Sequence, residues 1–545
     1  MKKLILLLTQ ILALSCAPTG SVNLQVWVHP CLKPMDRSEK PPEMLSTALE
    51  VKVTPGEYEP AAFAVRAGKP VNAEVRFVEG SLPIDWCKLY SVESLADTTN
   101  PNRLYLLSAP VEIDSADTRF FWLTVHPPED AAPGRYSGRV VVEAAGRRAR
   151  LDLSCEIYPF KLEDNRIMAG VFMCLADLPS GWYKDMKQHG IDAIQFFTWE
   201  WSVRDTTMLR RRGEWVEEPI GITRLGDRMV LDFTAMDRIM QQINDAGMKG
   251  PVVVSLGNDR FMHYETRIAE VMGLPIDTTV APTPEGWSSR TITFLGPPMS
   301  ERLDSLFISG LRQLHDHWNE MGWPQELVIL IYDEPTHGLL ERGKHRYDMI
   351  KKNFPNTRVY GVVMDKRELA EQVAPQCDII VANGDFDGVR EVVRKYGKDF
   401  YVYGSMGTVN YARFRMGCMP WQVRGSGAFF WMYNYWFYNP DRCAVYQHPD
   451  DWRTLVPSVQ WECIREGVDD LRYFATAEKM IGKLPDENRR KEASALLEEV
   501  RSSIDPDYRM TPAEKENMSG EELLEHYLVP QRVREKVVGI ILGLD

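Results

Sequence analysis

The sequence predicts an α/β protein built around a (β/α)8 TIM barrel, with an N-terminal β-sandwich and a C-terminal helical extension. Three observations lead to this prediction. Residues 22–160 hold short segments rich in β-branched and aromatic residues, separated by turn signals such as Pro133-Gly134. From about residue 165, continuous apolar runs alternate with amphipathic stretches, as in a parallel sheet covered by helices. From about residue 456 onward the apolar periodicity is helical.

These changes of pattern predict the domain boundaries. We expect a signal peptide over residues 1–15, a β-sandwich domain over 16–160, the barrel over 161–455, and helices packed on the barrel over 456–545.

The N-terminal region holds seven expected strands, several of which alternate apolar and polar residues. That density of short strands, with no helical run between them, is typical of a β-sandwich. The expected strands are LQVWVHP, ALEVKVTP, AAFAVRAG, AEVRFVEG, FFWLTVHP, YSGRVVVEAA and ARLDLSCEIY.

The central region holds eight apolar runs, the strand number of a TIM barrel, which takes about 250 residues. A doubly wound open sheet is the alternative, but no Gly-rich phosphate loop follows the first run. The expected strands cover 169–175, 193–197, 251–256, 327–332, 358–363, 377–382, 400–404 and 427–432. Helices are expected over 232–248, 300–321, 387–398, 458–484, 489–504, 512–527 and 532–542.

The composition excludes several classes of protein. Of the 545 residues, 44% are hydrophobic and 26% are charged, which excludes a disordered, collagen-like or polytopic membrane protein. The net charge is −13 and no basic run of five or more residues is present. Because nucleic-acid binding depends on clustered positive charge, we expect no nucleic-acid partner.

Residues 1–16 have the features of an export signal. Lys2 and Lys3 precede an apolar stretch that is too short to span a bilayer. The following Ala13-Leu14-Ser15-Cys16 resembles a bacterial lipobox, which predicts acylation of Cys16. We therefore expect a lipoprotein of the outer membrane or periplasm of a Gram-negative bacterium, held to the membrane only by its lipid. Cleavage by an ordinary signal peptidase, giving a soluble periplasmic or secreted protein, is the alternative.

The cysteine and histidine patterns predict neither disulfides nor a cofactor. Eight cysteines follow Cys16 without a CxxC pair, which favours buried free thiols. The histidines form no HExxH motif, and His315 and His317 point to different faces of an expected helix. We therefore expect no metal site and no cofactor.

Polar and aromatic residues follow the expected barrel strands at the end where barrel enzymes place their active sites. Aromatic rings stack on sugar rings, carboxylates and amides bind hydroxyl groups, and carboxylates supply the acid/base chemistry of glycoside cleavage. No Ser-His-Asp arrangement or P-loop competes with this interpretation. The expected substrate is therefore a glycan, and the candidate binding residues are Trp199, Glu200, Asn258, Asp259, Tyr403, Trp431 and Tyr433.

Asp333 and Glu334 are the candidate catalytic residues. Neighbouring side chains of a strand point to opposite faces, so two adjacent carboxylates share one site only where the strand ends. The segment LVILIYDEP places them there, with Pro335 stopping the strand. The alternative is that they cap the following helix.

The sequence resembles glycoside hydrolase family 123. The resemblance rests on Asp-Glu-Pro at the end of strand 4, on RFRMGCMPWQVRGSGAFFWMYNYW before and within strand 8, and on WECIREGVDD in the closing helix. It implies a retaining, exo-acting β-N-acetylhexosaminidase, with β-N-acetylgalactosamine as the expected sugar. The resemblance implies that Glu334 is the general acid/base. It also implies that Asp333 holds the 2-acetamido N–H while the acetamido oxygen attacks the anomeric carbon to form an oxazoline. Tyr403 or Tyr433 would then bond the acetamido oxygen, and Trp431 would stack under the sugar.

Two other functions stay open at this stage. A retaining glycosidase for a sugar without an acetamido group would need a separate carboxylate nucleophile, for which Glu200 and Asp259 are the candidates. The second open function is that of a glycan-binding lipoprotein without catalytic activity. The charges of the closing helix, Arg465, Glu466 and Asp469, are spaced as partners along one helix and are expected to be structural.

Overall fold

The computed structural model describes most of the chain in two compact units, which divide between Phe160 and Lys161. The described residues are 23–93, 102–115, 117–197, 218–257, 262–282, 291–335, 337–363, 367–405, 407–434, 443–451, 453–506, 508 and 512–544. Each unit has its own arrangement of strands and helices.

The first unit is all-β, as the sequence predicts, and consists of two five-stranded sheets. Strand alternation explains its core: in β2 (Ala48–Val53), Leu49, Val51 and Val53 are buried while the residues between them are exposed. Buried residues of both sheets belong to one hydrophobic core. The first sheet has the order β1 (Leu24–His29), β3 (Glu59–Ala67), β8 (Thr118–Val125), β5 (Cys87–Glu93) and β6 (Arg103–Leu106). The second has the order β2, β10 (Arg147–Ile157), β9 (Gly134–Ala144), β4 (Val71–Glu79) and β7 (Val111–Ile113), and a short η1 (Ile84–Trp86) precedes β5.

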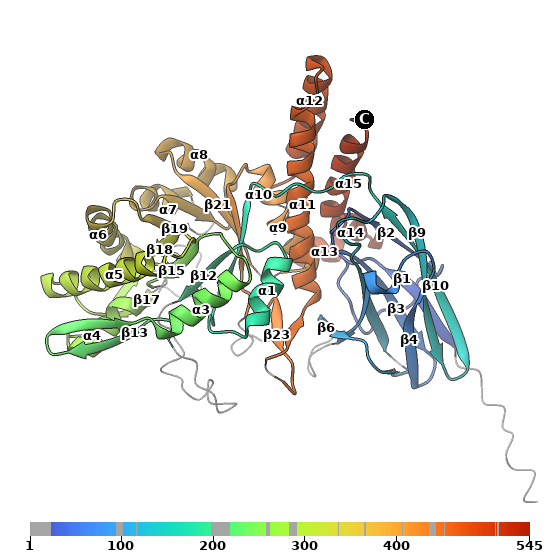
Figure 1. Ribbon diagram of the computed structural model, residues 1–545, viewed down its shortest axis with the longest axis horizontal. Coiled ribbons are helices and arrows are strands. Elements are labelled where there is room, and N and C mark those ends of the chain that lie inside the picture. The colour runs from blue at the N-terminus through green and yellow to red at the C-terminus, as the bar shows by residue number, and fades with distance from the viewer. Residues whose placement is uncertain are drawn as a thin grey trace, which may run out of the picture. The chain divides into compact units, whose positions relative to one another are not determined.

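The second unit holds a closed barrel of eight parallel strands, which confirms the predicted barrel (Figure 1). The strands pair in sequence order, and the last pairs with the first. Inward-facing side chains such as Val328, Tyr360 and Phe429 fill the interior. The barrel strands are β11 (Met168–Met173), β12 (Ala193–Phe197), β15 (Val252–Ser255), β18 (Leu327–Leu330), β19 (Arg358–Val363), β20 (Ile379–Ala382), β21 (Asp399–Ser405) and β22 (Gly427–Trp431).

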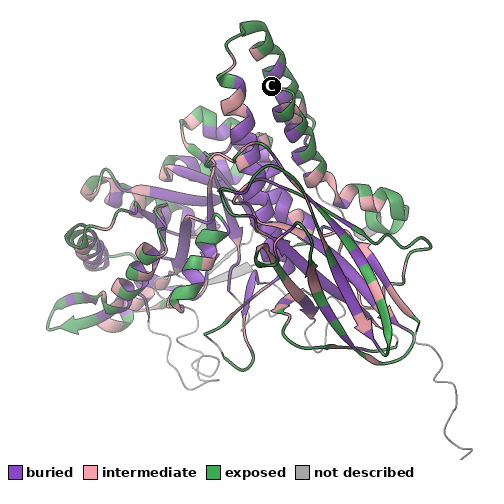
Figure 2. Cartoon of the chain, turned by 45° about the vertical axis from the view of Figure 1, so that its right-hand side comes forward, coloured by how far each residue is buried: buried purple, intermediate pink, exposed green. Residues whose placement is uncertain are grey.

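Helices lie between successive barrel strands along the chain. Helix α5 (Glu301–Met321) shows why they form: the Ser300 side chain caps its start, Gly322 ends it in the left-handed region, and one face is apolar. The barrel strands and the inner faces of the helices are buried, and the outer faces are exposed (Figure 2). The other helices are α1 (Ser180–Gln188), α3 (Thr234–Asp245), α4 (His263–Met272), α6 (His337–Asn353), α7 (Arg367–Val373), η4 (Ala374–Gln376), α8 (Phe386–Tyr396), α9 (Val409–Met416) and α10 (Cys418–Gln422).

Three hairpins that the sequence did not predict accompany the barrel, two between barrel strands and the third after β22. They are β13 (Gly221–Leu225) with β14 (Arg228–Asp232), β16 (Asp277–Pro282) with β17 (Thr291–Gly296), and β23 (Val445–Gln447) with β24 (Leu455–Pro457).

Helices also form the C-terminal part of the unit, where helical periodicity is predicted. They are α11 (Val459–Gly482), α12 (Glu487–Ser502), α13 (Pro512–Asn517), α14 (Gly520–Tyr527) and α15 (Val529–Leu542). Within the described residues, no helix is both long enough and apolar enough to cross a bilayer. The eight cysteines after Cys16 are all free thiols.

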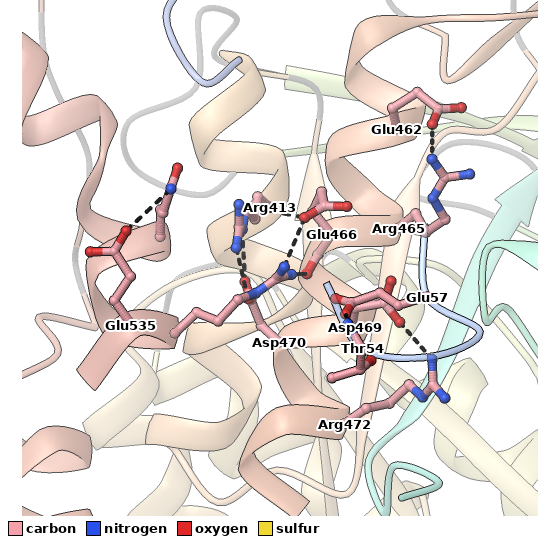
Figure 3. A network of polar contacts seen from close by, with 12 residues as sticks. Thr54, Glu57, Arg413, Glu462, Arg465, Glu466, Asp469, Asp470, Arg472 and Glu535 are labelled. Atoms are coloured by element: carbon pink, nitrogen blue, oxygen red, sulfur yellow. Dashed lines mark hydrogen bonds and ion pairs between the residues drawn. The ribbon is translucent and has the colours of Figure 1, made fainter. Parts of the chain in front are cut away.

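Helix α11 carries a buried ionic network, shown in Figure 3. Asp470 accepts two hydrogen bonds of 2.9 Å from Arg413 of α9, and Arg534 of α15 lies 3.0 Å from Glu466. Burial raises the pKa of Glu466, which the two arginines oppose. The network joins α9, α11 and α15, which supports the structural interpretation. The predicted pairing along one helix is correct only in part. Arg465 and Asp469 do pair with residues of α11, but Glu466 pairs with arginines of α9 and α15.

Candidate active site

The end of β18 carries the two candidate catalytic carboxylates. After β18, Ile331 and Tyr332 are still buried, Asp333 and Glu334 are partly exposed, and α6 begins at His337. Glu334 has a φ of 47°, in the left-handed region that side chains with a Cβ rarely adopt. Such a residue interrupts the alternation of the strand, so neighbouring carboxylates need not point to opposite faces. Strained conformations of this kind cluster at functional sites.

Tyr403 of β21 holds the Glu334 carboxylate. Its hydroxyl donates a hydrogen bond to Glu334 Oε1. The register of the barrel explains part of this geometry: Ala382 pairs with Val402, so the next residues, Asn383 and Tyr403, lie side by side. Asn383 Nδ2 donates to the Tyr403 hydroxyl over 3.2 Å.

Arg415 of α9 lies behind Asn383. Its Nη2 donates to the backbone oxygen of Asn383 over 2.5 Å and to the side-chain Oδ1 over 2.8 Å. Four side chains, two from α9 and β21 and two from the segments after β18 and β20, thus form a connected series from Arg415 through Asn383 and Tyr403 to Glu334.

The surroundings of Tyr403 keep its hydroxyl group protonated. Burial raises the pKa of Tyr403 well above its ordinary value, and the charges of Glu334 and Asp333 raise it further. The pKa of Tyr360 on β19 is also raised, by burial, by Tyr401 and by the charge of Asp333. The phenol of Tyr403 is therefore a hydrogen-bond donor at neutral pH.

A buried ion cluster anchors the residue just before the carboxylates. The Tyr332 hydroxyl donates to Glu265 Oε1 of α4 over 2.6 Å. Arg346 and Arg342 of α6 also donate to Glu265, Arg346 Nε over 2.9 Å. Arg346 in turn donates to Asp304 over 2.5 Å. The cluster fixes the end of β18 to α4 and α6, the latter being the helix that follows the carboxylates.

The structure places the other candidate residues in three ways. Trp431, at the end of β22, is partly buried and packs on the barrel core; its pairing with Ser405 puts it two residues beyond the level of Tyr403, towards the carboxyl ends of the strands. Tyr433 is fully buried, with its ring against Trp461 and its hydroxyl 3.5 Å from the Trp182 carbonyl oxygen. Four candidates, Trp199, Glu200, Asn258 and Asp259, lie outside the described residues, as does Cys16.

Tyr433 therefore does not join the group around Glu334 in this structure. Its neighbours are α1 and α11, because the chain after β22 turns towards these helices. Arg415 and Glu265 are neighbours of the site that the sequence did not predict, because both come from helices far from Asp333 along the chain. In the described part of the chain, no group of three or more His, Cys, Asp or Glu side chains is arranged to hold a metal ion.

Comparison with known families identifies this barrel. The model of the family described as "Glycoside hydrolase 123, catalytic domain" matches residues 180–477, which is more than half of the chain. The chain belongs to glycoside hydrolase family 123. It is thus a glycosidase, and its substrate is a glycan. The matched residues begin at α1, include Asp333 and Glu334, and end within α11.

Solved structures support the same fold. A family 123 glycoside hydrolase from Clostridium perfringens, studied for glycolipid glycan hydrolysis, is 12% identical, with a TM-score of 0.69, over 96% of this chain and 99% of that one. An endo-β-1,4-mannanase from Thermotoga petrophila is 14% identical, with a TM-score of 0.36, over 60% of this chain and 79% of that one. β-Glucuronidase 2 from Bacteroides uniformis is 11% identical, with a TM-score of 0.28, over 75% of this chain and 45% of that one. At such scores the last two add nothing to the assignment, and no curated protein matches the sequence.

Proposed function

We propose that this family 123 glycosidase is a retaining, exo-acting β-N-acetylhexosaminidase that releases β-linked N-acetylgalactosamine by substrate assistance. The observation that carries the proposal is the adjacency of Asp333 and Glu334 at the end of β18, with the Tyr403 hydroxyl on Glu334. A retaining enzyme with its own nucleophile uses two carboxylates about 5 Å apart that flank the scissile bond. When the substrate supplies the nucleophile, the protein needs only an acid/base and a group that orients the acetamide.

In the first step, Glu334 donates its proton to the glycosidic oxygen as the bond to the anomeric carbon breaks. The acetamido oxygen attacks that carbon and forms a protonated oxazoline, whose N–H stays hydrogen-bonded to the Asp333 carboxylate. In the second step, Glu334 takes a proton from water, which opens the oxazoline at the anomeric carbon. Two displacements at one carbon retain its configuration.

We propose different roles for the two candidate tyrosines. Tyr403 can donate one hydrogen bond through its hydroxyl group, and in the free protein it donates this bond to Glu334. A bound acetamido oxygen would have to draw this proton away, so we assign Tyr403 to holding Glu334 in the free enzyme. Tyr433 is buried against Trp461, and we assign it no contact with the sugar. Trp431 is partly exposed at the end of β22, and we propose that it stacks under the sugar.

A panel of 4-nitrophenyl glycosides tests this function. It holds the β-N-acetylgalactosaminide, the β-N-acetylglucosaminide, the β-galactoside and the α-N-acetylgalactosaminide. We expect the wild type to act selectively on the first, and Glu334→Gln to lose at least about a hundredfold in kcat/KM. Glu200→Gln is the control, since its activity should fall only if a separate carboxylate acts as nucleophile. A wild type that cleaves the β-galactoside best, or a Glu334→Gln variant with full activity, would refute the proposal.

We also propose that the chain is exported and acylated at Cys16. The charged and apolar leader and the Ala13-Leu14-Ser15-Cys16 sequence support this proposal. Expression in a Gram-negative bacterium fed with an alkyne analogue of palmitate should label the wild type but not Cys16→Ser. An unlabelled wild type released into the soluble fraction would contradict it.

A further inference from the structure

Arg415 is a buried cation behind the candidate active site. Its side chain is 1% exposed, and its guanidinium carbon lies 4.8 Å from the ring centroid of Phe386 and 5.1 Å from that of Tyr411. Burying a guanidinium is costly unless hydrogen bonds compensate it. Part of that compensation comes from Asn383, which accepts twice from Nη2. Two of the acceptors around this buried charge thus belong to Asn383, one of its backbone and one of its side chain.

The contacts give this series of hydrogen bonds a single direction. A guanidinium only donates, so the Asn383 atom that faces it has to be Oδ1, and Nδ2 then faces Tyr403. Because Nδ2 donates to the Tyr403 oxygen, the Tyr403 proton points elsewhere, to Glu334 Oε1. Arg415, Asn383 and Tyr403 therefore all donate towards Glu334. Hydrogen bonds in such a series strengthen one another.

This direction makes the two carboxylate oxygens of Glu334 unequal. Oε1 accepts from Tyr403, so a proton on Oε1 would compete with that hydrogen bond. A donor on the carboxylate also favours its ionised form. Among the described residues, Glu334 is faced by Asp333 beside it and by Tyr403 of β21, with Arg415 of α9 acting through Asn383; Tyr360 of β19 lies near Asp333.

We propose that Arg415 is a positioning residue: through Asn383 and Tyr403 it directs a hydrogen bond to Oε1 of Glu334 and so fixes the orientation of this carboxylate. The proposal rests on the role of Glu334 given under "Proposed function". Arg415 itself touches neither the reacting atoms nor the substrate in this account.

Replacement of Arg415 by methionine tests the proposal through a pH profile. In kcat/KM, the basic limb reports loss of the proton from the acid of the free enzyme. Without Arg415 the donor on Oε1 is no longer fixed, and the ionised form of Glu334 loses stabilisation. We expect the basic limb to move up by about one pH unit and kcat/KM to fall about tenfold, a typical size for residues that orient a reacting group. Arg415→Lys keeps the positive charge and an N–H donor. It should therefore restore part of the change in the basic limb and part of the loss in kcat/KM.

Arg501→Met is the matched control. Arg501 is 9% exposed and stacks 4.4 Å from the Trp421 ring centroid, but it pairs with Glu478 and Glu498. We expect its basic limb to stay in place. If Arg415→Met lowers activity without moving the limb, or if both variants move it equally, the proposal is wrong.

A double mutant separates positioning from general stability. If Arg415 acts through Tyr403, Arg415→Met should change kcat/KM less than twofold in a Tyr403→Phe background, because the link is already broken. An undiminished tenfold loss in that background would overturn the proposal.

A crystal structure of the Arg415→Met variant tests the same proposal without a substrate. If the wild type cleaves no glycoside of the panel, the proposed function fails, but the positioning of Glu334 is still observable. We expect Asn383 to reorient and the Tyr403 oxygen to leave hydrogen-bonding distance of Glu334. Unchanged positions of both side chains would refute the inference.

Discussion

Replacing Glu265 by glutamine removes one of the two carboxylates that pair with Arg346 inside the barrel unit. The Glu265 side chain is 2% exposed and that of Arg346 is 0% exposed, with 2.9 Å between Oε1 and Nε. A single Glu265 carboxylate also accepts from Arg342 and Tyr332. Glutamine keeps the shape but offers one acceptor oxygen, and its NH2 group faces donors.

Removing one partner of a buried ion pair costs about 3–5 kcal/mol, because the other charge stays buried without compensation. We expect Glu265→Gln to lie in this range. An exposed pair is worth less than about 1 kcal/mol. Glu487→Gln, which breaks a pair with Lys491 whose side chains are 68% and 71% exposed, is therefore the matched control.

Differential scanning calorimetry at neutral pH measures both variants against the wild type. We expect Glu265→Gln to lower the Tm of the barrel transition by several degrees and Glu487→Gln to leave it within about one degree. The charges of Arg346 and Arg342 outweigh the effect of burial and lower the pKa of Glu265. A lowered carboxyl pKa contributes stability that is present above the ordinary value near 4.5 and is lost as the pH falls through the lowered pKa. The Tm difference should therefore shrink on acidification. Equal Tm values for Glu265→Gln and the wild type at neutral pH would refute this reasoning.

Three further outcomes follow from the same contacts. Tyr403→Phe removes the donor on Glu334, so kcat/KM should fall about 10- to 100-fold and its basic limb should move to higher pH, which initial rates across a pH series will show. Ser300→Ala removes the cap of α5 and should cost about 1 kcal/mol in urea unfolding, whereas Ser503→Ala, at the C-terminal end of α12, should cost less than half of that. EDTA should leave the glycosidase rate unchanged; a loss of rate that zinc, calcium or magnesium restores would contradict the carboxylate mechanism.

The barrel was predictable because its strands are buried on both sides. Most of the strands are largely apolar runs, and two expected ranges, 193–197 and 358–363, coincide with β12 and β19. In the first unit, β5, β6 and β7 were missed because their short, mixed sequences, such as CKLYSVE, lack a clear alternation. Their pairing is decided by neighbours that are distant in sequence.

The candidate site was predictable only along the strand ends. Asp333 and Glu334 follow an apolar run, and Tyr403 and Trp431 lie within or at the end of others. Arg415 and Glu265 come from helices, and their spacing gives no sign of what they contact. Tyr433 also follows a strand, but sequence position does not show that its ring packs against Trp182 and Trp461 and is buried there.

The central claim is that the substrate's own acetamido group is the nucleophile. It is tested most directly with 4-nitrophenyl β-N-acetylgalactosaminides in which the N-acetyl group carries zero, one, two or three fluorine atoms. Fluorine withdraws electrons from the carbonyl oxygen, so substrate assistance predicts a steep and continuous fall in kcat/KM along the series. The first-formed sugar should be the β-anomer by 1H NMR. A rate that does not depend on fluorination, or an α-anomer as the first product, would contradict the account.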